Sequence, residues 1–182
     1  MAGIGHIIEA ALADARATYC HGAHNDIRLT MNNTTANPNE VIQVLNDLIE
    51  ICRDGQQGFS DASENISQVN WKKFCLEQSQ HRANYAGELQ QLVQGLGGQP
   101  ETTGSTTGSI HRAWINLKAG LGGGDEAIMS ACETGEDAAV NLYKKALEKD
   151  LPSDVQETVS QQYRAIQLSY NKVKSMRDNY VA

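Results

Sequence analysis

The sequence predicts an all-α protein built as a four-helix bundle. Apolar side chains recur at alternating spacings of three and four residues in four long segments, which is the pattern of helices with one buried stripe. Only three prolines occur among 182 residues, and β-branched residues do not cluster as they do in strands. Short breaks separate the first segment from the second and the third from the fourth, so the helices are expected to pair as hairpins.

The first helix is predicted to begin at Pro38, because Asn37 followed by proline in the first turn is a helix-start signal. Its apolar stripe comprises Val41, Leu45, Leu48, Cys52, Gly55, Phe59, Ala62 and Ile66. The second helix is predicted over residues 70–96, and Gly97 and Gly98 end it. Its inward stripe is expected to contain Trp71, Phe74, Gln78, Tyr85, Leu89, Leu92 and Leu96.

The third and fourth helices follow a long join. A glycine-, threonine- and serine-rich loop precedes a short helix over residues 110–121, and Asp125 is expected to cap a third helix that runs to about residue 150. Its inward residues are Ile128, Cys132, Gly135, Ala139, Leu142 and Ala146. The fourth helix begins at Ser153, which forms a capping-box spacing with Gln156. Its stripe comprises Val155, Val159, Gln162, Tyr163, Ile166, Tyr170, Val173 and Arg177.

The length of the join indicates the topology. A long connection lets the third helix run parallel to the second, as in ferritin-like bundles, where one crossover spans the bundle. We therefore expect residues 38–182 to form a ferritin-like four-helix bundle whose crossover, between helices two and three, carries a short helix. Residues 1–37 end in a polar run and are predicted to be a loosely ordered N-terminal extension.

Charge and composition restrict the classes of function. The formal net charge is −7, which argues against sequence-independent binding of nucleic acid. No apolar stretch approaches the roughly 20 residues of a membrane-spanning helix, and no secretory signal is recognisable. The four cysteines lie far apart without a C-x-x-C pair. A reducing cytoplasm is therefore the expected location, with free thiols instead of disulfides.

The first and third helices share a local pattern. The segments "LIEICRDGQQGF" and "IMSACETGEDAA" both place a cysteine four residues after an apolar residue and a glycine three residues after that cysteine. The matching pairs are Leu48 with Ile128, Cys52 with Cys132, Gly55 with Gly135, and Gln56 with Glu136. Gly135 lies on the buried stripe, so we expect close helix packing there to offset the roughly 1 kcal/mol helix penalty of glycine.

A polar layer is predicted at mid-height of the bundle. Counting back from the two tight turns places at a common level Gln56, Gln78, His81, Arg82, Glu136, Gln162, Tyr163 and Tyr170. Buried polar groups require partners, and an ion pair of Glu136 with Arg82, joined by His81 or a tyrosine hydroxyl, is the expected arrangement. Glu133 is expected to face solvent.

This layer sits where ferritin-like di-iron proteins hold their metals. Those sites take one Glu from each of two helices and Glu-x-x-His from each of the other two. The corresponding positions here hold Gln56, Gln78 with His81, Glu136, and Gln162 with Ala165. Neutral amides do not balance the charge of two metal ions, and Arg82 repels cations. No metal or other cofactor is therefore expected; if iron or manganese binds, His81 and Glu136 are the candidate ligands.

Several segments together resemble a known bacterial family. They are "LNDLIEICRDGQQGF", "HRANYAGELQQLVQGLGG", "GSIHRAWINLKAGL" and "CETGEDAAVNLYKKAL" followed by "LPSDV". They are similar to small ferritin-like four-helix-bundle proteins that are described as a domain of unknown function. The resemblance covers about residues 38–180 and implies a cytoplasmic ferritin-like bundle without an assigned activity. In that family the fourth helix often carries histidine where this chain has Tyr170, a departure that further weakens the case for metal.

Three functional hypotheses follow. The first is a non-catalytic helical protein, an interaction or stress-associated module with a degenerate metal-site layer, whose partner is a protein or another copy of the chain. No catalytic residues are assigned, since no P-loop, G-x-S-x-G or H-E-x-x-H motif occurs. The alternative is a ferritin-like iron or manganese protein with redox or oxidase activity. The third, a thiol redox sensor, requires an exposed cysteine, whereas Cys52, Cys75 and Cys132 fall in buried patterns.

Overall fold

The computed structural model describes residues 36–104 and 124–179, and these ranges contain four α-helices and no strand. The helices are α2 (Pro38–Asn65), α3 (Val69–Gly95), α5 (Gly124–Leu147) and α6 (Ser153–Asp178). The predicted all-α four-helix bundle is confirmed, and the helix boundaries lie close to the predicted ones. The predicted crossover helix, residues 110–121, and nearly all of the predicted extension, residues 1–37, lie outside the described residues.

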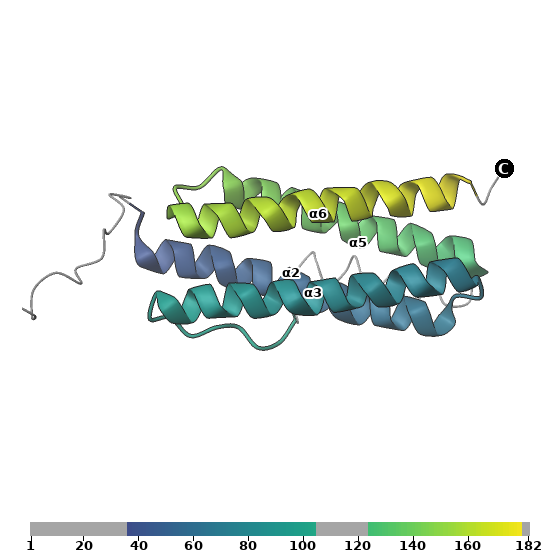
Figure 1. Ribbon diagram of the computed structural model, residues 1–182, viewed down its shortest axis with the longest axis horizontal. Helices are drawn as coiled ribbons and strands as arrows, with labels where there is room; N and C mark the ends of the chain where they lie inside the picture. Colours follow the sequence, from purple (N-terminus) through teal and green to yellow (C-terminus); the bar gives the residue numbers. More distant parts are fainter. Residues whose placement is uncertain (1–35, 105–123, 180–182) are drawn as a thin grey trace, which may run out of the picture. The chain divides into compact units, whose positions relative to one another are not determined.

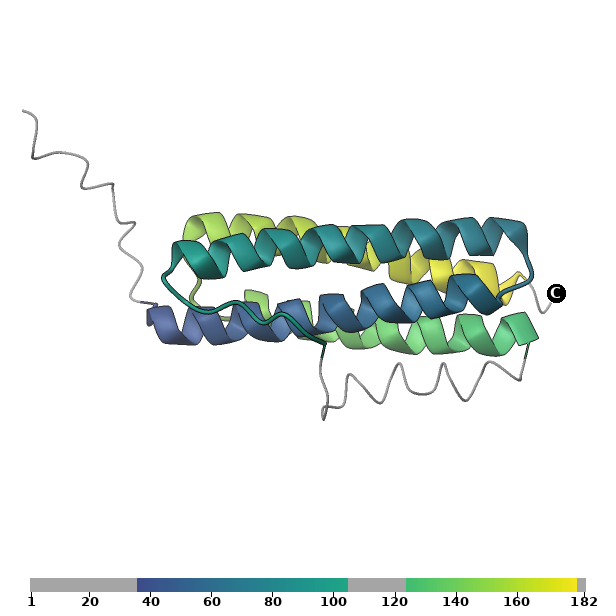
Figure 2. The ribbon, with the colours of Figure 1, turned by 90° about the horizontal axis from the view of Figure 1, so that it is seen from below.

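The helices form two antiparallel hairpins that pack side by side (Figures 1 and 2). Helix α2 packs against α3 and α5, and helix α6 packs against α5 and α3. The remaining pairs, α3 with α5 and α2 with α6, face each other across the diagonals of the bundle. Helix α5 begins beside the turn between α2 and α3, because its Asp125 contacts Ser67 and Gln68 there. It therefore runs parallel to α3, as the long join predicted.

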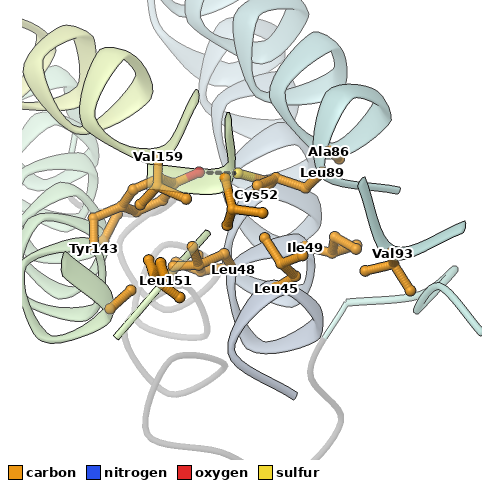
Figure 3. Close-up of a cluster of buried hydrophobic side chains, with 14 of the residues drawn as sticks. Leu45, Leu48, Ile49, Cys52, Ala86, Leu89, Val93, Tyr143, Leu151 and Val159 are labelled. Carbon is orange, nitrogen blue, oxygen red and sulfur yellow. Dashed lines mark hydrogen bonds between the residues drawn. The ribbon is translucent and has the colours of Figure 1, made fainter. Parts of the chain in front are cut away.

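Two apolar clusters fill the bundle, one on each side of its mid-height. Every residue of the predicted stripe of α2 is buried. The first cluster, drawn in Figure 3, surrounds Leu45, Leu48, Leu89 and Val159 near the beginning of α2. The second cluster lies near the beginning of α3, and its members include Phe59, Trp71, Ile128 and Val173. The polar side chains at mid-height therefore lie between two apolar layers.

The buried face of α3 differs from the predicted one. The buried residues of this helix are Trp71, Cys75, Arg82, Ala86, Leu89 and Val93. Of the predicted stripe, only Trp71 and Leu89 are buried, whereas Phe74, Tyr85 and Leu92 are half-buried at the edge. The prediction was wrong here because it followed the aromatic residues. The centre of the face is instead occupied by Arg82, whose burial depends on a carboxylate from another helix.

Smaller differences affect the second hairpin. In α5 the side chain of Tyr143 is fully buried, while the predicted Leu142 is half-buried. Ser153 is the first residue of α6 and not its cap, since the N-cap is Pro152 and makes no side-chain hydrogen bond. The two hairpins nevertheless repeat each other: residues 81–90 and 161–170 have the same exposure class at every position. The repeat seen between the first and third helices thus extends to the second and fourth.

Asp125 caps a different helix from the one expected. It lies in the first turn of α5, but its carboxylate accepts hydrogen bonds from the backbone N–H groups of Ser67 (2.8 Å) and Gln68 (3.0 Å) and from the Ser67 hydroxyl (2.7 Å). These groups immediately precede α3, whose N-cap Gln68 makes no side-chain cap. Burial opposes ionisation of Asp125, but the three hydrogen bonds outweigh it and lower the pKa of the carboxyl below its ordinary value.

Replacing Asp125 by alanine is expected to lower the free energy of unfolding by about 1–2 kcal/mol near neutral pH, as for loss of a helix cap. Because the folded-state pKa is lowered, this contribution is present above the unfolded pKa of about 4 and is lost as the pH falls through the folded pKa. Urea unfolding of both proteins between pH 7 and pH 3 measures it. Glu126→Ala, at the exposed neighbour, is the control; a difference independent of pH would contradict this role of Asp125.

None of the four described helices is long and apolar enough to cross a membrane.

Candidate functional site

An ion pair crosses the centre of the bundle from α3 to α5. One guanidinium nitrogen of Arg82, Nη2, donates to both carboxylate oxygens of Glu136 at 2.6 Å. The two side chains are 3% and 0% exposed. The Ser169 hydroxyl on α6 also donates to Glu136, at 2.9 Å. A single fully buried carboxylate therefore joins three helices.

The small size of Gly55 on α2 gives the Arg82 side chain room to cross the bundle. A Cβ atom on Gly55 would lie 3.3 Å from Cγ of Arg82, which is closer than ordinary van der Waals contact, and 3.4 Å from Cδ, which is at the lower limit of that contact. Helix α2 thus lies directly beside the aliphatic part of the arginine. In the first hairpin, the glycine of the repeated Cys-x-x-Gly pattern therefore leaves the space that the Arg82 side chain occupies.

A second chain of hydrogen bonds connects all four helices. The Cys52 sulfur of α2 lies 3.1 Å from the hydroxyl oxygen of Tyr143 on α5 (Figure 3). That hydroxyl donates to Oε1 of Gln162 on α6 at 2.7 Å. The amide nitrogen of Gln162 donates to Glu88 on α3 at 2.6 Å. Since the tyrosine proton is used toward Gln162, the cysteine thiol is the donor to the tyrosine oxygen.

The electrostatics of this centre keep both thiol and phenol neutral and the arginine charged. Burial raises the pKa of the Cys52 thiol, and the positive charge of Arg82 offsets this only in part. Burial also raises the pKa of the Tyr143 phenol well above its ordinary value, and the neighbouring Cys52 raises it further. Burial alone would lower the pKa of Arg82, but the Glu136 carboxylate outweighs it and raises that pKa. One arginine nitrogen, Nη1, is buried without a hydrogen-bond partner among the described residues.

The predicted polar layer is only partly assembled. The structure places Arg82, Glu136 and Gln162 in the buried centre. Four other predicted members, Gln56, Gln78, Tyr163 and Tyr170, are half-buried at its edges. Gln56 accepts a hydrogen bond from Arg53 of its own helix at 3.1 Å, and the Tyr163 hydroxyl accepts one from Gln167 at 2.8 Å.

The placement of His81 in this layer was wrong. His81 is exposed and stacks on the ring of Tyr85, with 6.3 Å between ring centroids. With Arg82 at the centre of the buried face of α3, the preceding residue points about 100° away from that centre. His81 is thus exposed while Glu136 is buried, so the structure does not bring the two candidate ligands together.

Glu133 was also wrongly expected to face solvent. Its side chain is 15% exposed and forms a salt bridge with Arg177 near the end of α6. The predicted stripe of α6 placed Arg177 inward, and the arginine is in fact half-buried. Glu133 at the edge of α5 thus pairs with Arg177 of α6, a pairing that the sequence pattern did not predict.

Three functional groups of the centre were not recognised from the sequence. Tyr143, Ser169 and Glu88 complete the two hydrogen-bonded chains. Ser169 carried a signal, because it lies one heptad after Gln162 on the buried face of α6. Glu88 carried none, since it is exposed and only its carboxylate reaches inward to the Gln162 amide.

The two cysteines of the second apolar cluster are buried and too far apart to form a disulfide in this arrangement. Cys75 on α3 and Cys132 on α5 are both 0% exposed, and the hydrogen bond to Cys75, together with burial, raises the pKa of the Cys132 thiol well above its ordinary value. No Cα atom of α3 lies within 8 Å of one in α5. A disulfide needs Cα atoms about 4.4–6.8 Å apart, so oxidation of this pair would require the helices to move.

The arrangement also limits metal binding. No group of three or more histidine, cysteine, aspartate or glutamate side chains is placed to hold a metal ion within residues 36–104 and 124–179. The buried carboxylate of Glu136 is already neutralised by Arg82. A guanidinium is always charged in proteins, so it competes permanently with any cation for this carboxylate.

Comparison with known proteins agrees with this architecture. The chain is similar in structure to a mutant of Dps1 from Mycobacterium smegmatis, with a TM-score of 0.61 at 15% sequence identity, covering 77% of this chain and 96% of that one. At this identity the likeness concerns the fold alone, and it defines a ferritin-like four-helix bundle. A family model described as a domain of unknown function, DUF2383, matches residues 40–149, which include α3, α5 and all but the first two residues of α2. The chain belongs to this family, and no curated protein matches it.

Proposed function

We propose that the protein is a non-catalytic ferritin-like bundle that acts through its surface, as an interaction module. The observation that carries this proposal is the diagonal ion pair of Arg82 with Glu136. Ferritin-like di-metal proteins collect carboxylates from four helices inside the bundle, and the sequence comparison assigned Glu136 to one of those positions. Here the buried centre holds a guanidinium paired with a carboxylate, and an amide that joins α5, α6 and α3 through Tyr143 and Glu88.

The exposed apolar side chains support a role for the α3 and α6 surfaces. Within the described residues, the large hydrophobic side chains that are exposed are Val69, Leu76 and Leu168, at 79%, 52% and 71%. All three belong to α3 or α6. Single exposed apolar residues are common on proteins, so their confinement to these two helices is the useful observation. It favours this side of the bundle for contact with a partner or a second copy of the chain.

Iron or manganese binding with redox activity is the competing function. The likeness to the Dps1 mutant chain favours it at the level of the fold. The charge of the buried layer opposes it, because two metal ions require several carboxylates and the Glu136 carboxylate of that layer is already paired with Arg82.

Elemental analysis distinguishes the two functions. The untagged protein is purified with and without added iron or manganese, and metal per chain is measured for the wild type, His81→Ala and Glu136→Gln, with circular dichroism to verify folding. We expect far less than one metal per chain in all three proteins. Near-stoichiometric metal that is lost in either variant would overturn the proposal.

A further inference from the structure

The α3–α6 side of the bundle contains a groove. Among the four neighbouring pairs of helices, α3 and α6 make the least contact with each other. A hollow of about 570 Å³ lies between the beginning of α3 and the end of α6. Sites for small ligands typically measure about 300–1,000 Å³, so the groove has the size of a small-molecule site.

The floor of the groove is apolar. It is formed by Trp71 and Phe74 of α3 and by Met176 of α6. Trp71 is 6% exposed and belongs to the second apolar cluster, against which Phe74 and Met176 also pack. The Phe74 ring meets Phe59 edge to face, with 6.2 Å between centroids. These side chains are held by the core, so the floor is pre-formed.

The walls of the groove carry positive charge on both helices. Lys73 lies on the α3 side and Lys172 on the α6 side, and Glu77 is the only acidic side chain among the described residues of the lining. Lys73 and Glu77 form a pair at 3.8 Å, but its side chains are 78% and 54% exposed, and such pairs are weak. The described residues of the lining, two lysines and one glutamate, thus carry a formal charge of +1 on a chain whose formal net charge is −7.

We propose that this groove binds a small amphipathic anion, an apolar ring or chain that ends in a carboxylate or sulfonate. The apolar part would lie on Trp71, Phe74 and Met176, and the anionic group would face Lys172, with Lys73 on the opposite wall. An uncharged apolar ligand would use the floor alone, and a hydrophilic anion would use the walls alone. The combination of both features selects a molecule that carries both. This inference goes beyond the proposed function and does not depend on whether the bundle binds metal.

A pair of fluorescent probes tests the proposal with the full-length protein. The first is 1-anilinonaphthalene-8-sulfonate, an apolar ring system with a sulfonate, and the second is N-phenyl-1-naphthylamine, the same ring system without the charge. We expect saturable 1:1 binding of the sulfonate to the folded protein. Lys172→Glu should weaken it by about three- to tenfold, the effect of reversing one exposed charge, and should leave binding of the uncharged probe within about twofold.

Two further variants complete the experiment. Lys174→Glu makes the same charge change on the same helix, two residues away and outside the lining of the groove, so it should leave sulfonate binding within about twofold. Met176→Gln places an amide on the floor and should weaken both probes. The proposal is overturned if the sulfonate binds equally well to the wild type and Lys172→Glu. It is also overturned if Lys174→Glu weakens sulfonate binding as much as Lys172→Glu, or if no saturable binding occurs.

Discussion

Replacing Glu136 by alanine is expected to lower the free energy of unfolding by about 3–5 kcal/mol, the cost of removing one partner of a buried ion pair. The variant would leave the Arg82 guanidinium buried without its carboxylate, and Ser169 without its acceptor. Burying an unpaired charge costs more than the pair itself contributes. Urea denaturation monitored by circular dichroism, at a pH near 7, measures the difference.

The matched control is Glu133→Ala, which removes a carboxylate from the same helix one turn away. Its salt bridge to Arg177 is at the edge of the bundle, where the arginine side chain is 29% exposed. Partly exposed pairs contribute at most about 1 kcal/mol. Equal and small effects of the two substitutions would contradict the central role of Glu136.

A double substitution separates the charge from the packing. Arg82→Met with Glu136→Leu removes both charges and keeps apolar volume at the centre of the bundle, and it should restore most of the stability that Glu136→Ala loses. If the double variant is no more stable than Glu136→Ala, the unpaired charge is not the cause of the loss.

Replacing Gly55 by leucine should be the second large effect, with a loss of about 2–4 kcal/mol in the free energy of unfolding. The new side chain would fill the space that the Cγ and Cδ atoms of Arg82 occupy. It would therefore overpack the interior, which typically costs about 1–3 kcal/mol, and would also displace the arginine from Glu136. Thermal and urea unfolding of the variant measure the loss.

Gly87→Leu provides the control for Gly55→Leu. A Cβ atom on Gly87 meets nothing within 4 Å, and this glycine lies inside α3. Replacing it should stabilise the helix by up to about 1 kcal/mol, because glycine is a poor helix former. A loss of stability in Gly87→Leu as large as that in Gly55→Leu would show that the close approach of Arg82 is not responsible.

The sequence carried enough information for the fold, because the determinants of the fold are repeated along it. The stripe of α2 is apolar at nearly every position, so its period alone identifies the buried face. The tight turns and the long join then restrict how four such helices can be connected. An error of one residue in a helix boundary changes none of these features.

The orientation of α3 was less predictable for a physical reason. Its buried face contains Arg82 and Ala86, while its edges contain Phe74 and Tyr85. An arginine is rarely fully buried unless it is paired, and its partner is 54 residues further along the chain. No local pattern carries that information, so the predicted stripe omitted Arg82 and placed Gln78 at the buried face instead.

The diagonal ion pair has a consequence for which hairpins can pair with each other during folding. The hairpin of α2 and α3 contributes only the arginine, and the hairpin of α5 and α6 contributes only the glutamate. In the 80-residue repeat, Gln162 stands where the first hairpin has Arg82, and Gln56 stands where the second has Glu136. If the same hairpin from two different chains paired, two arginines or two glutamates would be buried together. This repulsion disfavours pairing of identical hairpins from different chains during synthesis. Only the union of the two different halves neutralises the interior.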